Sequence, residues 1–546
     1  MKRKENASSQ KLLGAYYTPK IIAETMVSWV REECFNNVLE PSCGDGVFLE
    51  CMEMSGHWPV QGIDAIEIEN EAAEKVERRF AAHDNCNVVN GDFFAFYHEN
   101  GQRNTYSLII GNPPYIRYQY LTAMQRGILS EILVTHGMKE NKLINAWVAF
   151  MVACVQMLAD NGTIAFVIPA EILQVAFAEE LRLFLARHLT TITLVTFKKL
   201  VFPEIEQEVL LFIGEKRRDY EQTSIRIYEL EDLDALHGFD INAQEFQPLG
   251  HVKEKWTRYF ITSEEAGLLR DLSHDKRFCQ FRDLGLINVG ITTGDNNFFS
   301  VTEEIAERYE LESVVLPLIG RSAHAHSIFF TSEDWQHNVK AGKKAQLVYF
   351  PDSVSYQDYP EKHKEYILLG EENKINEGYK CSIRDRWYII PSVWVPDAFF
   401  LRRNNFYPKF VLNQCNAVST DTMHRIKFNN GVIPENALLS YYNSIAFAFT
   451  EICGRSYGGG VLEILPGEMG NIVLPKIESI DCVLRKRLLR VIDDVVRNDK
   501  DIEVALNYID AELLVRFLKI PADLCVMCRN IWKKMQSRRL NREHAV

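Results

Sequence analysis

Short apolar runs alternate with longer helical patterns through about residue 215 of this 546-residue chain. Each run ends at turn residues, which is typical of a parallel strand buried on both faces. The rhythm of strand, helix and strand predicts an α/β domain with a doubly wound, Rossmann-like sheet whose ligands bind at the C-terminal strand ends. The expected strands span residues 38–40, 60–68, 88–90, 107–111, 163–168, 192–197 and 208–213, and expected helices include 21–33 and 145–158.

The pattern changes in the second half of the chain. The alternation fades after about Tyr228, and helical spacing of apolar residues begins again from Ile480. A chain of this length is expected to fold as two or three domains. We therefore expect an α/β domain over residues 1–225, an α+β domain over 226–478, and a helical segment over 479–546 that packs with the second domain.

The composition is typical of a soluble globular protein, with 47% apolar and 25% charged residues. The longest apolar segment, 143–159, is interrupted by Asn145 and Gln156, so we expect a buried helix and no membrane contact. Twelve cysteines are scattered along the chain, which fits a reducing cytoplasm. Cys525 and Cys528 form one close pair without a second, so we expect buried thiols and predict no metal.

Asn112, Pro113, Pro114 and Tyr115 follow an apolar run that ends in Gly111. We expect Gly111 to let the chain turn and the two prolines to keep that turn rigid. The Asn112 amide oxygen and the Pro113 carbonyl oxygen are neighbouring acceptors, which suits an exocyclic amino group with two hydrogens to donate. Tyr115 offers a flat face on which a planar ring can stack.

Acidic residues and glycines follow the earlier expected strands. Glu40 ends the first strand, and Gly44 and Gly46 follow in a turn where the backbone can approach a ligand closely. An acid that binds ribose hydroxyls is expected about 20 residues after such a turn. Glu67 and its alternative Asp64 both lie near this distance.

These stretches resemble the motifs of S-adenosylmethionine-dependent amino-methyltransferases. Residues 112–115 resemble motif IV, the pattern Glu-Pro-x-x-Gly-x-Gly-x-Phe from Glu40 resembles motif I, residues 66–70 resemble motif II, and residues 88–94 resemble motif III. The stretch 14–19 resembles motif X, with Thr18 expected to cap a helix that starts at Pro19. The resemblance implies that S-adenosylmethionine is the cofactor.

The resemblance also implies roles for individual residues. Glu40 would face the positive amino end of the cofactor, Asp92 would accept a hydrogen bond from its adenine, and Phe93 would pack on that ring. Phe94 is expected to belong to the core, and Phe202 resembles the motif VIII aromatic residue that packs on the target base. The implied cofactor contacts are Tyr17, Thr18, Glu40, Ser42, Gly44, Glu67, Asp92, Phe93, Asn112 and Pro114.

The motif order and the long C-terminal region resemble the gamma class of DNA amino-methyltransferases, the TaqI-like adenine-N6 enzymes of restriction–modification systems. The resemblance covers residues 14–214 and implies a target-recognition domain after them. It implies that duplex DNA binds between the halves and that one adenine leaves the stack, to lie between Tyr115 and Phe202. Asn112 and the Pro113 carbonyl would then accept its N6 hydrogens.

This resemblance implies a prokaryotic, cytoplasmic, nucleoid-associated enzyme that acts as a monomer on DNA. We expect modification without cleavage, with any cognate restriction endonuclease acting separately. Three alternatives remain open. They are cytosine-N4 methylation, which the same tetrad can serve, methylation of RNA or of protein glutamine, and a binding module with an inactive site.

DNA contacts are expected mainly from a basic and aromatic stretch, although the net charge of the chain is −13. Arginine can pair two donors with guanine or with phosphate oxygens. The basic tail after Arg529 is expected to lie along phosphates. The expected contacts are Lys199, Arg384, Arg386, Arg402, Arg403 and Tyr457.

Overall fold

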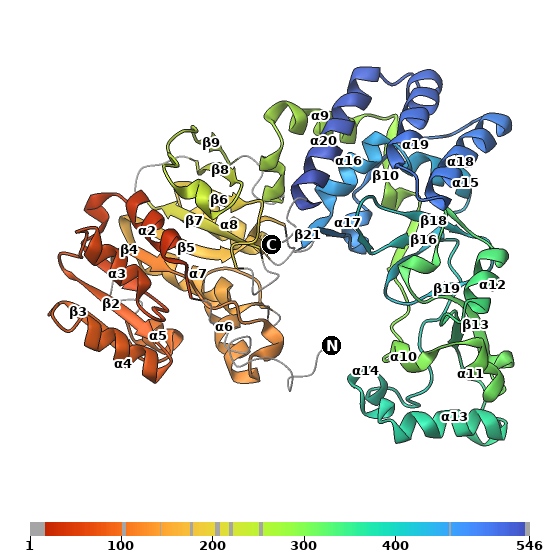
Figure 1. Ribbon diagram of the computed structural model, residues 1–546, viewed down its shortest axis with the longest axis horizontal. Coiled ribbons are helices and arrows are strands. Elements are labelled where there is room, and N and C mark those ends of the chain that lie inside the picture. The colour runs from red at the N-terminus through yellow and green to blue at the C-terminus, as the bar shows by residue number, and fades with distance from the viewer. Residues whose placement is uncertain are drawn as a thin grey trace. The chain divides into compact units, whose positions relative to one another are not determined.

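The computed structural model describes residues 17–100, 105–141, 144–174, 178–202, 208–217, 222–249, 255–457 and 460–540. The chain forms two compact units, which meet in sequence after Phe260. The first unit is built on one large sheet, and the second on several small sheets with a group of C-terminal helices (Figure 1).

The sheet of the first unit has nine strands among the described residues, in the order β3-β2-β1-β4-β5-β7-β6-β8-β9. Strands β1 to β5 run parallel, whereas β7 is antiparallel to both β5 and β6. The strands are β1 (Asn37–Glu40), β2 (Gly62–Glu67), β3 (Cys86–Asn90), β4 (Tyr106–Gly111), β5 (Leu158–Pro169), β6 (Thr191–Phe197), β7 (Val209–Glu215), β8 (Ser224–Leu230) and β9 (Gln247–Pro248).

The chain reverses its direction of travel across the sheet between β1 and β4. From β1 it builds outward through β2 to β3, and it then returns to add β4 on the other side of β1. Such a reversal separates the loops at the carboxyl ends of the two central strands and leaves a crevice between them. The sheet therefore predicts a ligand site beside Glu40 and Gly111, the last residues of these strands.

Helices cover the sheet because its central strands are buried on both faces. Helix α7 is the most apolar, and all its residues except Gln156 are buried, as expected for the segment 143–159. The helices are α2 (Lys20–Trp29), α3 (Val47–Met54), α4 (Asn70–Arg79), α5 (Phe93–Asn100), α6 (Ala123–Thr135), α7 (Ala146–Met157) and α8 (Ala178–His188) (Figure 1).

Two local expectations were wrong. The capping residue of α2 is Pro19, one position after the expected Thr18, and its side chain makes no capping hydrogen bond. Gly111 does not turn the chain but ends β4 in extended backbone at φ 159°. Its lack of a side chain matters for packing, since a Cβ there would lie 3.4 Å from Pro41 and 3.6 Å from Glu40.

The expected domain boundary at residue 225 falls inside β8. This strand pairs with β6 along its whole length, so the first sheet continues beyond the last recognisable βα alternation. Strand β9 then pairs with β8, and the first unit ends at Phe260. The short β8–β9 extension is antiparallel and lacks a crossover helix, which explains why the alternation of the sequence stops before the sheet does.

The second unit contains a five-stranded sheet ordered β11-β20-β16-β18-β14 and three smaller sheets. Its strands are β10 (Phe278–Gln280), β11 (Gly285–Val289), β12 (Ser300–Val301), β13 (Val315–Ile319), β14 (Phe329–Phe330), β15 (Gln346–Val348), β16 (Ala398–Leu401), β17 (Arg403–Asn404), β18 (Phe410–Asn413), β19 (Val418–Ser419), β20 (Met423–Phe428), β21 (Arg455–Tyr457), β22 (Val461–Glu463) and β23 (Val473–Pro475). Its longer helices are α9 (Ser263–His274), α12 (Ser332–Lys340), α13 (Glu361–Glu372), α15 (Pro434–Tyr441), α16 (Ser444–Cys453), α18 (Cys482–Arg497), α19 (Ile502–Ile509) and α20 (Ala522–Leu540).

The last helix, α20, is held to the second unit by a buried ion pair. Arg539 donates to both carboxylate oxygens of Glu451 on α16, at 2.9 and 3.1 Å, and also to the Gly460 carbonyl oxygen. Both side chains are almost fully buried. Residues 479–540 therefore belong to the same compact unit as residues 261–478.

Breaking this pair is expected to destabilise the second unit. Arg539→Met should lower the free energy of unfolding by about 3–5 kcal/mol, because it leaves the Glu451 carboxylate buried without its partner. Glu451→Leu combined with Arg539→Met should recover most of that loss. Denaturant unfolding measures both variants. Lys500→Ala, which removes an exposed pair with Asp494, serves as the control and should change little. Equal stability of the single variant and the wild type would contradict the expectation.

Candidate functional site

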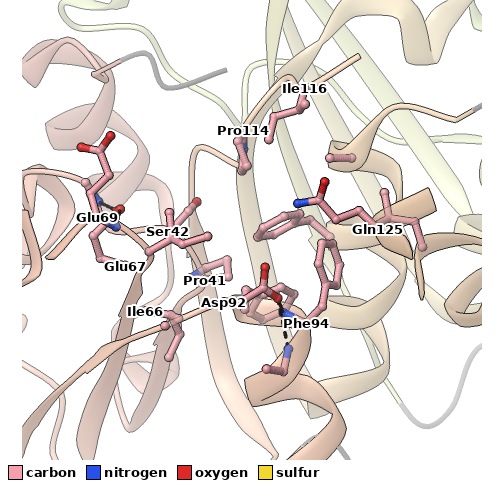
Figure 2. Close-up of a pocket in the computed structure, with 18 of the residues that line it drawn as sticks. Pro41, Ser42, Ile66, Glu67, Glu69, Asp92, Phe94, Pro114, Ile116 and Gln125 are labelled. Atoms are coloured by element: carbon pink, nitrogen blue, oxygen red, sulfur yellow. Dashed lines mark hydrogen bonds between the residues drawn. The ribbon is translucent and has the colours of Figure 1, made fainter. Parts of the chain in front are cut away.

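A pocket of about 500 Å³ opens at the carboxyl ends of the first four strands. This volume is typical of sites for small molecules and cofactors. Figure 2 shows residues from the loops after β1, β2, β3 and β4 around one space. The lining comprises Tyr17, Pro41, Ser42, Gly44, Ile66, Glu67, Ile68, Glu69, Ala72, Gly91, Asp92, Phe93, Phe94, Ala95, His98, Asn112, Pro114, Ile116, Leu121, Gln125, Ile128, Leu129, Ala146 and Phe150.

Glu67 ties two of these loops together. One carboxylate oxygen accepts a hydrogen bond from the Gly44 backbone N–H at 2.8 Å, and the other accepts one from the Glu69 N–H at 2.8 Å. Asp64 lies in the middle of β2, where it accepts from Tyr106 and Asn87, and it does not line the pocket. Of the two candidate acids, the structure brings Glu67 to the pocket.

The turn after β1 approaches the pocket through its backbone. Gly46, which precedes α3, has φ +79°, and a Cβ there would lie 3.2 Å from Val76. The Ser42 hydroxyl donates to the Asn112 carbonyl oxygen at 3.2 Å, which joins this turn to the tetrad after β4. Tyr17 lines the pocket with half of its surface exposed, whereas Thr18 does not line it.

Asp92 follows β3 and faces the pocket (Figure 2). One of its carboxylate oxygens accepts from the backbone N–H groups of Phe94 and Ala95, at 2.8 and 3.2 Å. Phe93 stacks on Phe150 with ring centroids 4.7 Å apart. Phe94, which was expected to serve only the core, is also buried but lines the pocket beside Phe93.

Two members of the tetrad line the pocket and two do not. Asn112 and Pro114 face it, whereas Pro113 and Tyr115 are buried beside it. The Tyr115 hydroxyl donates to the Val167 carbonyl oxygen at 3.1 Å, and burial raises the pKa of this phenol well above its usual range. Phe202, with 7% of its surface exposed, also lies in the core and does not line the pocket.

Glu40 carries a carboxyl group without a charge partner. Its side chain is 1% exposed, and its Oε2 has no hydrogen-bond partner among the residues that the structure describes. Burial raises the pKa of Glu40 well above 4.5, and the negative charges of Asp45 and Glu67 raise it further. Glu40 does not itself line the pocket, although the next two residues, Pro41 and Ser42, do.

One wall of the pocket comes from a region to which the motifs assign no contact. Leu121, Gln125, Ile128 and Leu129 lie at or near the start of α6 and line the pocket. The sequence did contain a signal for this helix start, since Thr122-x-x-Gln125 is a capping-box pattern. Their approach to the loops after β1 to β3 is a tertiary contact that local pattern does not reveal.

The structure uses two of the expected DNA-binding arginines for internal contacts. Arg384 donates to the carbonyl oxygens of Thr292, Thr293 and Trp387 at 3.2, 2.8 and 3.2 Å. Arg386 donates to the Val354 carbonyl oxygen at 2.7 Å and pairs with Asp352, which raises the pKa of its guanidinium. These contacts hold the segment after α14 (Tyr379–Ser382) in place.

The other expected DNA contacts also have charge partners or lie outside the described side chains. Lys199 pairs with Asp232 at 2.7 Å in the first unit. Arg402 and Arg403 both approach Glu463, at 2.9 and 3.3 Å, and the Arg403 side chain is 70% exposed. The backbone of Tyr457 ends β21, but its side chain lies outside what the structure describes.

Basic residues of the C-terminal tail are paired within the second unit. Arg529 pairs with Asp510 at 2.9 Å, and Lys534 pairs with Glu265 at 3.2 Å. Within the described part of the chain, no cluster of three or more His, Cys, Asp and Glu side chains could hold a metal ion. No helix in that same part is both long and apolar enough to span a bilayer.

Comparison with known proteins identifies both halves of the chain. Residues 54–202 match the family model for the Eco57I restriction-modification methylase. Residues 253–514 match the model for the C-terminal domain of type II methyltransferase M.Eco57I. The first match lies in the first compact unit, and all but the first eight residues of the second match lie in the second unit.

Individual relatives extend along most of the chain. Type II methyltransferase M.AccI from Acinetobacter calcoaceticus is 24% identical over 544 residues, which cover 93% of this chain and 94% of that protein. Type II methyltransferase M.BanIII from Aneurinibacillus aneurinilyticus is 24% identical, covering 71% and 74%. The type IIL restriction-modification enzyme MmeI, solved in complex with DNA, has the same fold, with a TM-score of 0.54 at 12% identity, covering 99% of this chain and 78% of that one.

The sheet and its pocket form a doubly wound α/β methyltransferase fold, and the methylase family that residues 54–202 match implies S-adenosylmethionine as the cofactor. Residues 54–202 and 253–514 are thus Eco57I-type restriction–modification methylase domains, and type II methyltransferases are among the relatives of the chain. The residues present suit this cofactor. Acceptors on Glu67 and Asp92 suit hydroxyl and amino groups, and the Phe93 ring suits a planar base. Glu40, the residue before the lining residues Pro41 and Ser42, is a buried acid whose Oε2 has no partner among the described residues, which suits a nearby cation.

The unpaired carboxyl group predicts a pH-dependent cost in stability. Because the folded protein holds the Glu40 proton above pH 4.5, wild-type stability should fall as the pH rises from 4.5 towards the raised pKa. Glutamine does not ionise, so Glu40→Gln should not show this pH dependence. The free energy of unfolding of the variant minus that of the wild type should therefore increase with pH, by up to about 1.4 kcal/mol for each pH unit. Denaturant unfolding of the ligand-free proteins at pH 5, 6 and 7 measures the difference. A difference that does not change with pH would show that Glu40 is already ionised.

The anchoring role of Arg384 predicts a loss of folding stability. Arg384→Ala should lower the free energy of unfolding by about 1–3 kcal/mol, because it leaves backbone carbonyl groups without their donor. Arg403→Ala should leave stability nearly unchanged, since that side chain is mostly exposed. Unfolding curves of the two variants make the comparison. Equal stability of both variants would argue against the anchoring role.

Proposed function

We propose that this protein transfers a methyl group from S-adenosylmethionine to N6 of an adenine in duplex DNA and does not cleave the DNA. One observation carries the proposal. The tetrad after β4 places Asn112 and Pro114 on the same pocket as Glu67, Asp92 and the glycine turn after β1. The pocket therefore shares a wall with Asn112, one of the two proposed amino-group acceptors, and Pro113, which carries the other, is the next residue along the chain.

The cofactor, when bound, supplies a methyl group on a positively charged sulfur. Glu67 would accept the ribose hydroxyls with the lone pairs that its backbone partners leave free. Asp92 would accept from the adenine amino group, and Phe93 would pack against that ring. The remaining proposed contacts come from Tyr17, Thr18, Glu40, Ser42, Gly44, Asn112 and Pro114.

Glu40 gives the cofactor site its electrostatic preference. Its neighbours Asp45 and Glu67 are acidic, so no nearby described group compensates a charge on its carboxyl group. A bound ammonium group would favour the ionised carboxylate and lower its pKa towards the usual range. We infer that Glu40 faces the amino end of the cofactor across the Pro41–Ser42 turn and ionises when the cofactor binds.

The tetrad performs the chemical step on the target base. The Asn112 amide oxygen and the Pro113 carbonyl oxygen accept the two N6 hydrogens, which draws the nitrogen lone pair out of conjugation with the ring. The amino nitrogen would then take the methyl group from the sulfur of the bound cofactor, and its proton would leave to water. Because the transfer is direct, no cysteine or other covalent nucleophile is needed.

The target base must leave the helix to reach this position. Tyr115 and Phe202 are the proposed faces of its binding site. Both rings are buried in the protein, and the Tyr115 hydroxyl donates to the Val167 carbonyl oxygen. Stacking on the base therefore requires DNA binding to uncover both rings. We therefore infer that Tyr115 and Phe202 become available to the base only after DNA binds.

Duplex DNA is the proposed substrate, and the second unit is the proposed target-recognition domain. The complex of MmeI with DNA supports this choice by likeness of fold. Arg403 is the best placed of the expected DNA-binding arginines, since its side chain is 70% exposed. Lys199, Arg384, Arg386 and Arg402 could contact DNA only beside their present partners. We expect a monomer on DNA and any restriction endonuclease to act separately.

Cytosine-N4 methylation is the alternative reaction, because the same acceptors suit both exocyclic amino groups. Incubation of the protein with unmethylated genomic DNA and methyl-labelled cofactor distinguishes the two. Digestion to nucleosides should place the label in N6-methyl-2′-deoxyadenosine. Label in N4-methyl-2′-deoxycytidine would overturn the adenine assignment, and label in neither would overturn DNA methylation.

Replacing Asn112 should separate binding from catalysis. Asn112→Ala removes one of the two acceptors for the amino group but leaves Glu67 and Asp92 unchanged, so cofactor affinity should change by less than about tenfold. Turnover should fall by at least about a hundredfold, which is the scale seen when one positioned catalytic hydrogen bond is removed. Calorimetry measures the affinity and single-turnover methyl transfer measures the rate. Wild-type turnover in this variant would contradict the assigned role.

A further inference from the structure

Helix α6 contributes a polar side chain to the pocket that the mechanism above does not use. Gln125 lies in the first turn of this helix and lines the pocket together with Leu121, Ile128 and Leu129. Figure 2 shows its amide group directed into the pocket, on the side away from Ser42 and Glu67. The other three lining residues of this wall are apolar, so Gln125 is its polar element.

The orientation of the Gln125 amide is fixed by the helix cap. Its Oε1 accepts hydrogen bonds from the Thr122 backbone N–H at 3.0 Å and from the Thr122 hydroxyl at 3.1 Å. The Thr122 hydroxyl oxygen in turn accepts from the Gln125 backbone N–H at 3.2 Å. Because the amide oxygen is held by the cap, the amide nitrogen with its two hydrogens is the end that remains for a ligand.

The opposite walls of the pocket offer mainly hydrogen-bond acceptors. A hydrogen-bond donor on the α6 wall would therefore contact ligand atoms that those walls cannot. Glu67, Glu69 and Asp92 are acceptors when ionised, and the Ser42 hydroxyl already donates to Asn112. An adenosyl group has hydroxyl and amino hydrogens that suit those acids. It also has ring nitrogens and ribose oxygens that accept hydrogen bonds, and these need donors from the protein.

We propose that Gln125 is a cofactor-positioning residue whose amide N–H groups donate to an acceptor atom of the adenosyl group. The proposal rests on the proposed function, because it takes S-adenosylmethionine as the ligand of this pocket. The capping box would then have two roles. It begins α6, and it orients the Gln125 amide N–H groups towards the adenosyl group, which contacts the acids of the facing loops on its other side.

Two substitutions separate these tasks. Gln125→Glu keeps an oxygen for the capping box, which glutamate serves as well as glutamine, but it removes both amide N–H groups. Thr122→Ala removes the capping hydroxyl, yet it leaves the Gln125 amide and its bond from the Thr122 backbone N–H. The first variant therefore tests the donor, and the second tests the helix cap.

The experiment measures affinity by calorimetry for S-adenosylmethionine and for S-adenosylhomocysteine, which has a neutral sulfur. Thermal unfolding is recorded for each protein without ligand. Gln125→Glu should unfold at nearly the wild-type temperature and should bind both ligands about tenfold more weakly. Thr122→Ala should unfold at a lower temperature and bind both ligands within about threefold of the wild type.

Several results would overturn the proposal. Wild-type affinity in Gln125→Glu would show that the side chain serves only as a cap. A loss of affinity confined to one ligand would assign the effect to the added charge. A loss in Thr122→Ala as large as that in Gln125→Glu would assign it to the position of α6. Failure of the wild-type protein to bind either ligand would instead remove the proposed function itself.

Discussion

The site depends on the reversal of the chain between β1 and β4. This reversal places the ends of neighbouring parallel strands at one edge and separates the loops that follow them. Four loops of different sequence then meet around one pocket, each contributing a side chain or a turn that follows directly from a strand end. The strands fix the points at which the loops begin, and the side chains of the loops line the pocket.

Negative charge dominates this arrangement, and backbone N–H groups hold much of it in place. Glu67 joins two loops through Gly44 and Glu69, and Asp92 is fixed by the start of α5. Glu40 differs because it is buried without such partners. Burial raises the pKa of Glu40, so this carboxyl group favours its neutral form while the carboxylates of Glu67 and Asp92 are held by backbone donors.

The fold of the first unit could be predicted from the sequence because each of its main features is encoded within a short stretch of residues. Buried strands, a glycine turn and a proline-locked tetrad can each be identified within ten residues, and the pocket contains Glu67, Asp92 and Asn112 as expected. The partners of the arginines were harder to predict, because a guanidinium group can donate hydrogen bonds to a backbone carbonyl oxygen as well as to a phosphate oxygen. Only the fold shows that Arg384 meets Thr292 and Thr293, which are about ninety residues away in sequence. The α6 wall was missed for the same reason, since its contact with the β-loops is long-range.

The closing of the second unit by α20 has a consequence for the order in which the protein is made. The Glu451 carboxylate enters the interior with α16, but its partner Arg539 is translated 88 residues later. The first unit, which ends at Phe260, can complete its sheet while the ribosome is still producing the rest of the chain. The second unit cannot form its Glu451–Arg539 ion pair until Arg539, one of its last residues, has been translated. Methyl-donor binding could thus mature on the nascent chain well before the part proposed to choose the DNA site is assembled.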